Sequence, residues 1–329
     1  MGDMVMTTPL LRALAARHGQ PCAVLGRGGW LAPLFKHLPF VGEIRTIDSL
    51  HWPPWFFSPN KRAITAWLRA RGPGPVYLLQ TDRDTMRVVD PAKLTITAFN
   101  EQLEQRAVEH TCARFVRLGA FTDAVPTGTE LAVSADELAE VDSWLADLGC
   151  AGKPLVLIQP GNRRTRRITV SGRDFKVWPA ENWVATMRGV LARLPDARTL
   201  VIGSPKEQPL AAALAAACSD GRALAVADRL PLRRLCALLR RAHSLISVDT
   251  GPAHAAAALG CPVIGIFGRT DPRVTGPLSL GSLVVPVVPP SARTLRPDQG
   301  WPRGLELDQI AVDDVLRAWE MLVPTVRRA

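Results

Sequence analysis

The chain has 329 residues, of which 47% are apolar, and its 40 Lys and Arg against 30 Asp and Glu give a net charge of +10. This length suits about two domains with full cores, and no apolar run approaches the roughly 18 residues of a membrane-spanning helix. The basic balance favours polyanionic partners such as phosphorylated substrates or anionic lipid surfaces. A compositional bias towards Ala and Arg is the alternative explanation. No nucleic-acid-binding module or zinc-ligand spacing is present, so we expect no nucleic-acid partner.

The six cysteines are scattered and form no C-x-x-C pair. This usage fits thiols in a reducing cytoplasm better than a disulfide framework or a zinc site.

The first half of the chain mixes helical and strand patterns. We predict helices at residues 10–18, 31–37, 63–71, 110–119 and 137–148, and strands at 22–25, 43–47 and 75–80. The aromatic, proline-broken segment Trp52–Phe57 cannot form a regular helix.

After a linker at residues 149–154 the alternation becomes regular. We predict strands at 155–159, 198–203, 223–226, 244–248, 262–267 and 284–288, and helices at 181–194, 207–218, 232–241, 253–259 and 311–323. Alternating strands and helices in two halves predict an α/β protein with two parallel-sheet domains, residues 1–152 and 153–329.

The stretch 244–272 contains the strongest local signal. Its apolar strand runs into Asp249-Thr250-Gly251-Pro252, a helix start in which the proline occupies a position that needs no N–H. A helix N-terminus at the carboxyl end of a parallel strand binds phosphate, and His254, one turn in, would add a donor. The alternative is an ordinary turn, with Asp249 as the cap and His254 on the helix surface.

The motif Asp249-Thr-Gly-x-x-His254, followed by Gly268-x-Thr-Asp-Pro272, resembles the donor-site signature of glycosyltransferase family 9, the lipopolysaccharide heptosyltransferases. Further resemblance lies in Gly2-Asp3 with Pro9, in the loop 159–179, in Gly203–Glu207 and in His110-x-x-x-Arg114. The resemblance implies the GT-B architecture, in which two Rossmann-like domains face a central cleft and the terminal helix packs back on the first domain.

The resemblance implies that Asp3 is the general base, because a carboxylate facing the cleft can accept the proton of an attacking sugar hydroxyl. From the residues alone, Asp3 is a flexible N-terminal acid. The family has a buried strand directly before Gly-Asp, where this sequence begins. Either the start codon lies upstream, or the first N-terminal strand is missing and Asp3 is poorly anchored.

Most donor-binding residues are likewise implied by the resemblance. The phosphates would contact Gly161, Asn162 and Lys176 as well as the helix start. Glu207 would bind the ribose, and Leu230 would pack on adenine. The full set of donor-binding residues is Gly161, Asn162, Lys176, Glu207, Leu230, Asp249, Thr250, Gly251 and His254. The alternatives are a solvated charged loop at 161–176, a first-turn glutamate that favours the helix dipole, and a core leucine.

Two other nucleotide-binding classes are disfavoured. The sequence has no P-loop, and Gly26-x-Gly28-Gly29 has Leu31 where a dinucleotide-binding motif requires glycine. Asp82-x-Asp84 imitates a metal motif of the other glycosyltransferase fold, but the matches above imply the metal-independent class. We therefore expect no metal and no cofactor.

The resemblance implies an inverting transferase that moves a heptose from ADP-heptose to an inner-core or lipid A acceptor of lipopolysaccharide. The partners would be the nucleotide-sugar, an anionic glycolipid and the inner leaflet, with the protein cytoplasmic and peripheral to the inner membrane. Trp52–Phe57 and basic residues of the first domain would meet the membrane. The alternatives are another GT-B enzyme, such as a nucleotide-sugar epimerase, and a catalytically degenerate nucleotide-binding homologue.

Overall fold

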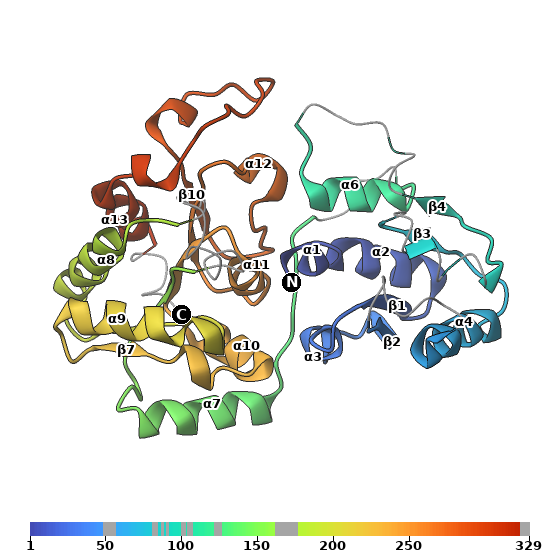
Figure 1. The fold of residues 1–329 in the computed structure, drawn as a ribbon, viewed down its shortest axis with the longest axis horizontal. Coiled ribbons are helices and arrows are strands. Elements are labelled where there is room, and N and C mark those ends of the chain that lie inside the picture. The colour runs from blue at the N-terminus through green and yellow to red at the C-terminus, as the bar shows by residue number, and fades with distance from the viewer. Residues whose placement is uncertain are drawn as a thin grey trace. The chain divides into compact units, whose positions relative to one another are not determined.

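The computed structural model of the protein describes residues 1–48, 57–80, 85–86, 89, 92–99, 103, 108–121, 127–161 and 177–322. Its contacts divide the chain into two compact units (Figure 1). Unit 1 comprises Met1–Met6 and Gly128–Ala329, and unit 2 comprises Thr7–Thr127.

Unit 1 is built on a six-stranded parallel sheet in the order β10-β9-β8-β5-β6-β7. The strands are β5 Leu155–Gln159, β6 Arg198–Val201, β7 Ala223–Ala225, β8 Ser244–Val248, β9 Val263–Ile266 and β10 Val284–Val287. From β5 the chain adds strands outward in one direction to β7, and from β8 in the opposite direction to β10. The topological switch point, where such sheets bind ligands, therefore lies between the carboxyl ends of β5 and β8.

Helices cover both faces of this sheet, so its central strands are buried throughout. On one face Val156, Ile158 and Ile246 join a core with residues of α8 (Ala180–Arg193), α9 (Gln208–Cys218) and α13 (Val312–Glu320). The other face is covered by α10 (Leu232–Arg241) and α11 (Gly251–Ala258). The alternate residues of β5 and β8, including Gln159 and Ser247, point to this second face.

Helix α7 (Ala135–Asp147) packs against α10 in unit 1. Three ion pairs join them, namely Glu137–Arg233, Glu140–Arg234 and Asp142–Arg241. Residues 128–152, which the sequence prediction places in the first domain, group by contact with unit 1, where α7 packs on α10. The predicted terminal helix is α13, which packs in the core of unit 1 on α8, β9 and β10.

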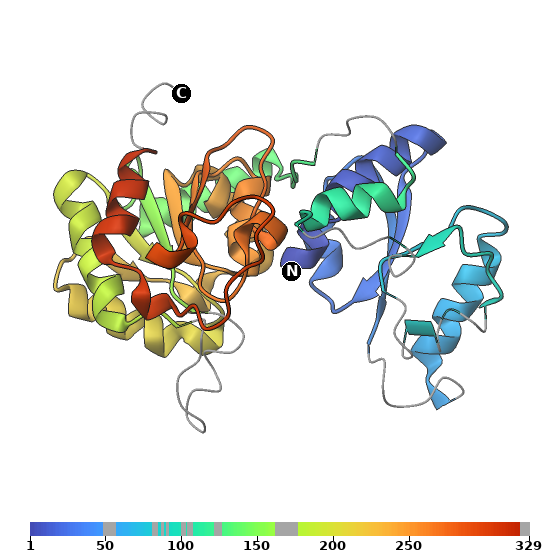
Figure 2. The same ribbon diagram turned by 90° about the horizontal axis from the view of Figure 1, so that it is seen from above.

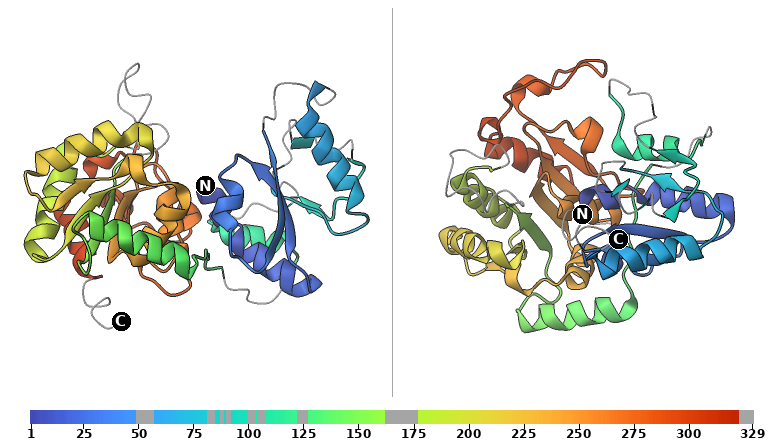
Figure 3. Two further views of the ribbon diagram at one scale, coloured as in Figure 1. Left: turned by 90° about the horizontal axis from the view of Figure 1, so that it is seen from below. Right: turned by 45° about the vertical axis from the view of Figure 1, so that its right-hand side comes forward.

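Unit 2 contains two pairs of parallel strands with helices against them (Figure 3). The elements of unit 2 that the structure describes are α2 Thr8–His18, β1 Cys22–Arg27, α3 Leu31–Phe35, β2 Val41–Ile47, α4 Pro59–Ala70, β3 Tyr77–Leu78, β4 Ala98–Phe99 and α6 Thr111–Leu118. Helix α4 begins at a cap, where Ser58 Oγ accepts a hydrogen bond from the Lys61 amide at 3.2 Å and Pro59 follows. Its Ile64 packs on Ile47 of β2.

Several sequence predictions fall outside the described residues. Trp52–Trp55 and Phe56 lie there, whereas Phe57 is described and exposed. Asp82, Asp84, Asn162 and Lys176 also lie there. Within the described ranges, no helix is long and apolar enough to cross a membrane.

All six cysteines are free thiols. Burial raises the pKa of Cys112 to about 12 and that of Cys236 to about 11, so neither thiol ionises near neutral pH.

Candidate functional site

The switch point brings two buried polar residues together at the ends of β5 and β8. Gln159 is the last residue of β5 and lies in register with Ser247 of β8. Gln159 is 3% exposed and Ser247 is fully buried. The Ser247 hydroxyl donates to the Val248 carbonyl at 2.7 Å and lies 3.3 Å from the Thr250 hydroxyl. These contacts link the sheet edge to the turn that opens α11.

Helix α11 begins at this edge with an unusual cap. Its N-cap is Thr250, which is extended and makes no side-chain capping bond. The N-cap position therefore falls on Thr250, one residue after the Asp249 of the alternative interpretation. Pro252, in the first turn, has no N–H to satisfy. The Thr250 side chain therefore leaves the N–H groups at the positive end of the helix to other partners.

A glycine closes the far end of α11. Gly260 has a φ of +78°, and the Cys261 amide donates to the Ala256 carbonyl at 2.9 Å. This Schellman arrangement requires the left-handed backbone that glycine adopts without strain. Between the two ends the alanines of the helix are buried, so its axis approaches the sheet closely.

A short N-terminal helix, α1 (Gly2–Val5), packs on the first turn of α11 (Figures 1 and 2). A Cβ added to Gly2 would lie 2.8 Å from Cδ2 of His254, and one added to Gly251 would lie 2.8 Å from Cβ of Met1. His254 is only 4% exposed, so the alternative that places it on the helix surface is wrong. Asp3 of α1 is exposed beside this contact. The packing of α1 thus anchors Asp3 next to the start of α11.

Glu207 lies at the carboxyl end of the neighbouring strand β6. It closes a capping box, in which its Oε2 accepts hydrogen bonds from the amide and the hydroxyl of Ser204, both at 2.7 Å. Its Oε1 is buried and has no hydrogen-bond partner among the described residues. Oε2 therefore stabilises the loop, which agrees with the alternative of a structural first-turn glutamate. Oε1 is left without a hydrogen bond from the described residues.

The remaining predicted donor-site residues follow the same edge. Gly161 comes two residues after β5, and its carbonyl accepts a hydrogen bond from Gln159 Nε2 at 2.8 Å. Leu230, after β7, is 8% exposed. The strand order therefore arranges an apolar side chain, a carboxylate and an uncapped helix N-terminus along adjacent strands β7, β6, β5 and β8.

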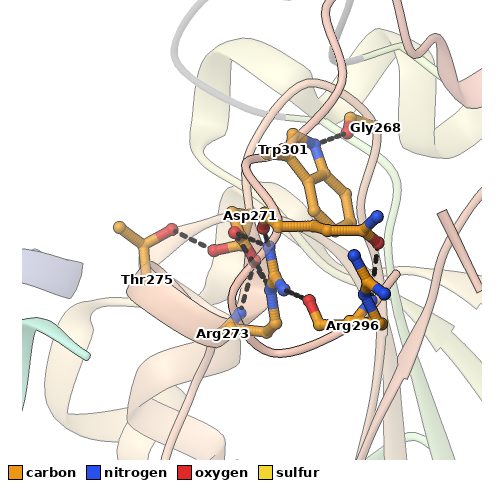
Figure 4. A network of polar contacts seen from close by, with 7 residues as sticks. Gly268, Asp271, Arg273, Thr275, Arg296 and Trp301 are labelled. Carbon is orange, nitrogen blue, oxygen red and sulfur yellow. Dashed lines mark hydrogen bonds and ion pairs between the residues drawn. The ribbon is translucent and has the colours of Figure 1, made fainter. Parts of the chain in front are cut away.

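The motif Gly268-x-Thr-Asp-Pro272 serves a structural role (Figure 4). Asp271 caps α12 (Pro272–Thr275) by accepting the Arg273 amide at 2.9 Å, and both its carboxylate oxygens bind the Arg273 guanidinium. That guanidinium also donates to the carbonyls of Arg296 at 2.9 Å and Gln299 at 2.8 Å. Trp301 Nε1 donates to the Gly268 carbonyl at 2.9 Å. This network fastens the loop after β10 to the end of β9.

His110 and Arg114 lie on α6 of unit 2. His110 is the N-cap of that helix, and its Nδ1 accepts a hydrogen bond from the Cys112 amide at 3.1 Å. This geometry gives the histidine a capping role. No group of three potential metal ligands (His, Cys, Asp or Glu) gathers within the part of the chain that the structure describes.

Sequence reasoning missed Gln159, Ser247 and Arg273 as residues that shape this edge. The available signal was polarity, because glutamine and serine interrupt strands that are otherwise apolar. The part played by Arg273 depends on carbonyl groups more than 20 residues away, and no local pattern encodes such a contact.

Comparison with known proteins places this geometry in one family. The sequence profile of glycosyltransferase family 9 (heptosyltransferase) matches residues 90–288. Lipopolysaccharide heptosyltransferase 1 of Pseudomonas aeruginosa is 31% identical over 218 residues, which cover 64% of this chain and 53% of that protein. Its counterpart in Escherichia coli K12 is 37% identical over 105 residues, covering 32% of this chain and 31% of that protein. These matches span about half or less of the relatives' length.

Solved structures share the fold over the whole chain. A family 9 glycosyltransferase from Veillonella parvula has a TM-score of 0.77 at 17% identity, covering 98% of this chain and 94% of that one. The ADP-heptose lipopolysaccharide heptosyltransferase II of E. coli has a TM-score of 0.74 at 19% identity, with 98% and 96% covered. E. coli heptosyltransferase WaaC, solved with ADP, has a TM-score of 0.67 at 21% identity, with 98% and 97% covered.

These likenesses confirm the predicted GT-B fold class of two Rossmann-like α/β units. The family profile covers more than half of the sequence, and it includes the β5–β8 switch point and the start of α11. The chain belongs to glycosyltransferase family 9, the heptosyltransferases.

Proposed function

We propose that the protein is an inverting glycosyltransferase that moves a heptose from ADP-heptose to an inner-core or lipid A saccharide of lipopolysaccharide. The observation that carries this proposal is the order of groups along the carboxyl edge of the unit 1 sheet. Leu230, Glu207 and the start of α11 follow strands β7, β6 and β8, in the order in which ADP presents a base, a ribose and a diphosphate.

Each group suits the part of ADP that it would meet. The buried Leu230 offers an apolar surface to adenine. Glu207 Oε1, buried without a partner in the described structure, would accept a hydrogen bond from a ribose hydroxyl. The first turn of α11, whose N-cap side chain makes no capping bond, would bind the diphosphate through its N–H groups. Asn162 and Lys176 remain proposed phosphate ligands by family resemblance, and Gly161 marks the start of their loop.

The proposed reaction is a direct displacement at the anomeric carbon. The acceptor oxygen attacks, a new carbon–oxygen bond forms, and the bond from the anomeric carbon to the diphosphate breaks. Asp3 would take the proton of the acceptor hydroxyl. The departing diphosphate gains negative charge, which the N-terminus of α11 and His254 would stabilise. We propose that this chemistry needs no metal and no cofactor.

The proposed acceptor is an anionic glycolipid, reached at the cytoplasmic face of the inner membrane. The net charge of +10 supports attraction to such a surface. Phe57, at the end of the aromatic segment, is 67% exposed and would contribute an apolar contact. Deleting the segment Trp52–Phe57 should weaken binding to anionic vesicles, and unchanged binding would argue against this part of the proposal.

The first test of the function is calorimetric titration with ADP and with UDP. We expect the wild-type protein to bind ADP in preference to UDP, and Asp249→Ala to lose that binding. Asp298→Ala, which changes an exposed acid in the same unit, should bind ADP like the wild type. A wild-type protein that binds neither nucleotide would contradict the proposal and favour the catalytically degenerate alternative.

The second test separates binding from chemistry. Asp3→Asn should retain ADP binding while its rate of heptose transfer falls by roughly 10²- to 10⁴-fold, the range that general bases contribute. Transfer at the wild-type rate would remove Asp3 from the catalytic role.

A further inference from the structure

Gln159 has an unsatisfied acceptor at the donor-site edge. Its side chain is 3% exposed, and its Oε1 has no hydrogen-bond partner among the described residues. A buried polar atom without a partner is costly, so such atoms in native proteins are few and are often satisfied by a ligand or water. The position is also informative, because Gln159 ends β5 at the switch point of the sheet.

The orientation of the amide group follows from its other contact. Gln159 Nε2 lies 2.8 Å from the Gly161 carbonyl oxygen, which can only accept a hydrogen bond. The nitrogen must therefore face Gly161, and the oxygen must be the atom left without a partner. The free atom at this position, Gln159 Oε1, can therefore only accept a hydrogen bond.

The surroundings connect this acceptor to the helix start. Gln159 is in register with Ser247 on the adjacent parallel strand, about 4.8 Å away, and both side chains point to the α11 face of the sheet. The Ser247 hydroxyl lies 3.3 Å from that of Thr250, the N-cap of α11. Gln159, Ser247 and Thr250 therefore follow one another from the end of β5 to the N-cap of α11.

An acceptor in this place discriminates between the chemical parts of a nucleotide-sugar. Ionised phosphate oxygens are themselves acceptors and gain nothing from it, whereas a hydroxyl donates to it. We infer that Gln159 is a specificity-determining residue of the donor site, whose Oε1 accepts a hydrogen bond from a hydroxyl of the bound nucleotide-sugar. The inference rests on the proposed function, and the hydroxyl belongs either to the ribose or to the transferred sugar.

Calorimetric titration of wild type and Gln159→Met with inorganic diphosphate, ADP and ADP-heptose tests this inference. We expect the variant to bind diphosphate like the wild type and to bind the hydroxyl-bearing ligand roughly tenfold more weakly. A loss already present with ADP assigns the ribose hydroxyl, and a loss confined to ADP-heptose assigns the sugar. If Gln159→Met does not fold, Gln159→Asn, whose shorter amide cannot span the same distance, takes its place.

The control is Thr199→Val. Thr199 Oγ1 is also buried without a partner in the described structure, but it lies near the start of β6, away from the carboxyl edge. Its removal should leave the affinity for all three ligands unchanged.

Two results would overturn the inference while leaving the function intact. Equal affinity of wild type and Gln159→Met for all three ligands would mean that the acceptor contacts no ligand. An equal loss with all three, diphosphate included, would mean that Gln159 only shapes the loop through Gly161. A wild-type protein that binds none of the ligands would instead overturn the proposed function.

Discussion

Gly2 of α1 lies so close to His254 of α11 that a methyl group added to it would come 2.8 Å from the imidazole Cδ2. His254 is buried and cannot swing into solvent, so a larger residue at position 2 must displace α1. Asp3 is the next residue. The contact therefore couples the position of the proposed base to the helix that would bind the diphosphate.

Replacing Gly2 by alanine should displace Asp3 relative to the start of α11. We expect Gly2→Ala to lower the rate of transfer by roughly tenfold or more, because a displacement of about 1 Å at a reacting group is costly. ADP affinity should change less than the rate. Steady-state kinetics and calorimetry would measure the two effects separately.

Gly221→Ala is the matched control, since a Cβ at Gly221 meets no atom within 4 Å and its backbone is not left-handed. It should transfer at the wild-type rate. If Gly2→Ala does the same, the packing of α1 does not position Asp3.

The ion pairs between α7 and α10 should differ in their contribution to stability. The Arg233 side chain is 16% exposed and that of Glu137 is 11% exposed, and Arg233 Nη2 also donates to the Ala132 carbonyl at 2.8 Å. Arg233→Met leaves a largely buried carboxylate without its charge partner, so we expect a loss of about 3 kcal/mol in the free energy of unfolding. Urea denaturation would measure it.

Arg241→Met serves as the comparison on the same helix. Its pair with Asp142 is 42% and 48% exposed, and its loss should cost less than about 1 kcal/mol. Equal costs for the two variants would mean that burial does not set the strength of these pairs.

Arg273 should control the order of the loop that follows β10. Arg273→Met removes the bonds to the Arg296 and Gln299 carbonyls, and we expect the amides of residues 296–299 to exchange with solvent roughly fivefold to tenfold faster. Hydrogen-exchange mass spectrometry would detect this. Arg296→Met, whose side chain is 73% exposed, should leave exchange unchanged. Slow exchange in both variants would show that other contacts hold the loop.

His243 should make stability depend on pH. Burial lowers the pKa of His243 below its ordinary value of 6.5. Its Nδ1 lies 3.0 Å from Ser244 Oγ, which accepts a hydrogen bond from Trp319 Nε1 at 2.9 Å. The Ser244 proton is then free to point at a neutral His243, and protonation of the ring would remove that acceptor.

Because the unfolded chain takes up this proton at a higher pH than the folded protein, stability falls as the pH drops through about 6.5. We expect the free energy of unfolding to decrease from about pH 7.5 to about pH 5.5. The decrease should be smaller in His243→Gln, as followed by denaturation at each pH. The same slope in both proteins would assign the dependence to other groups.

Elements defined by local chemistry were predicted correctly. Strands β5 and β8 and helix α10 have the predicted bounds, because buried apolar runs and a clear amphipathic pattern end at turn residues. The turn before α11 was likewise readable from its glycine and proline. The four-residue helices α1 and α12 were not, because contacts distant in sequence hold them in place.

The candidate site was likewise predictable only where local sequence determines it. Its place at the start of α11 follows from the Asp-Thr-Gly-Pro sequence, whereas the burial of His254 depends on packing by residues 1 and 2, more than 240 positions earlier. Helix α7 is joined to α10 of unit 1 by packing and by three charge pairs whose partners lie about 100 residues apart. Charged residues on a helix surface do not reveal which partner they will find.

The division of the chain makes unit 2 an insertion. Unit 1 contributes both the first six residues and everything from Gly128 onward, so the polypeptide crosses between the units twice. A fragment that starts at Gly128 would contain the whole six-stranded sheet but would lack the helix that covers Gly251 and His254. Unit 1 is therefore assembled from two separate segments, and a synthetic peptide of residues 1–6 would supply the contacts to Gly251 and His254 that the fragment lacks.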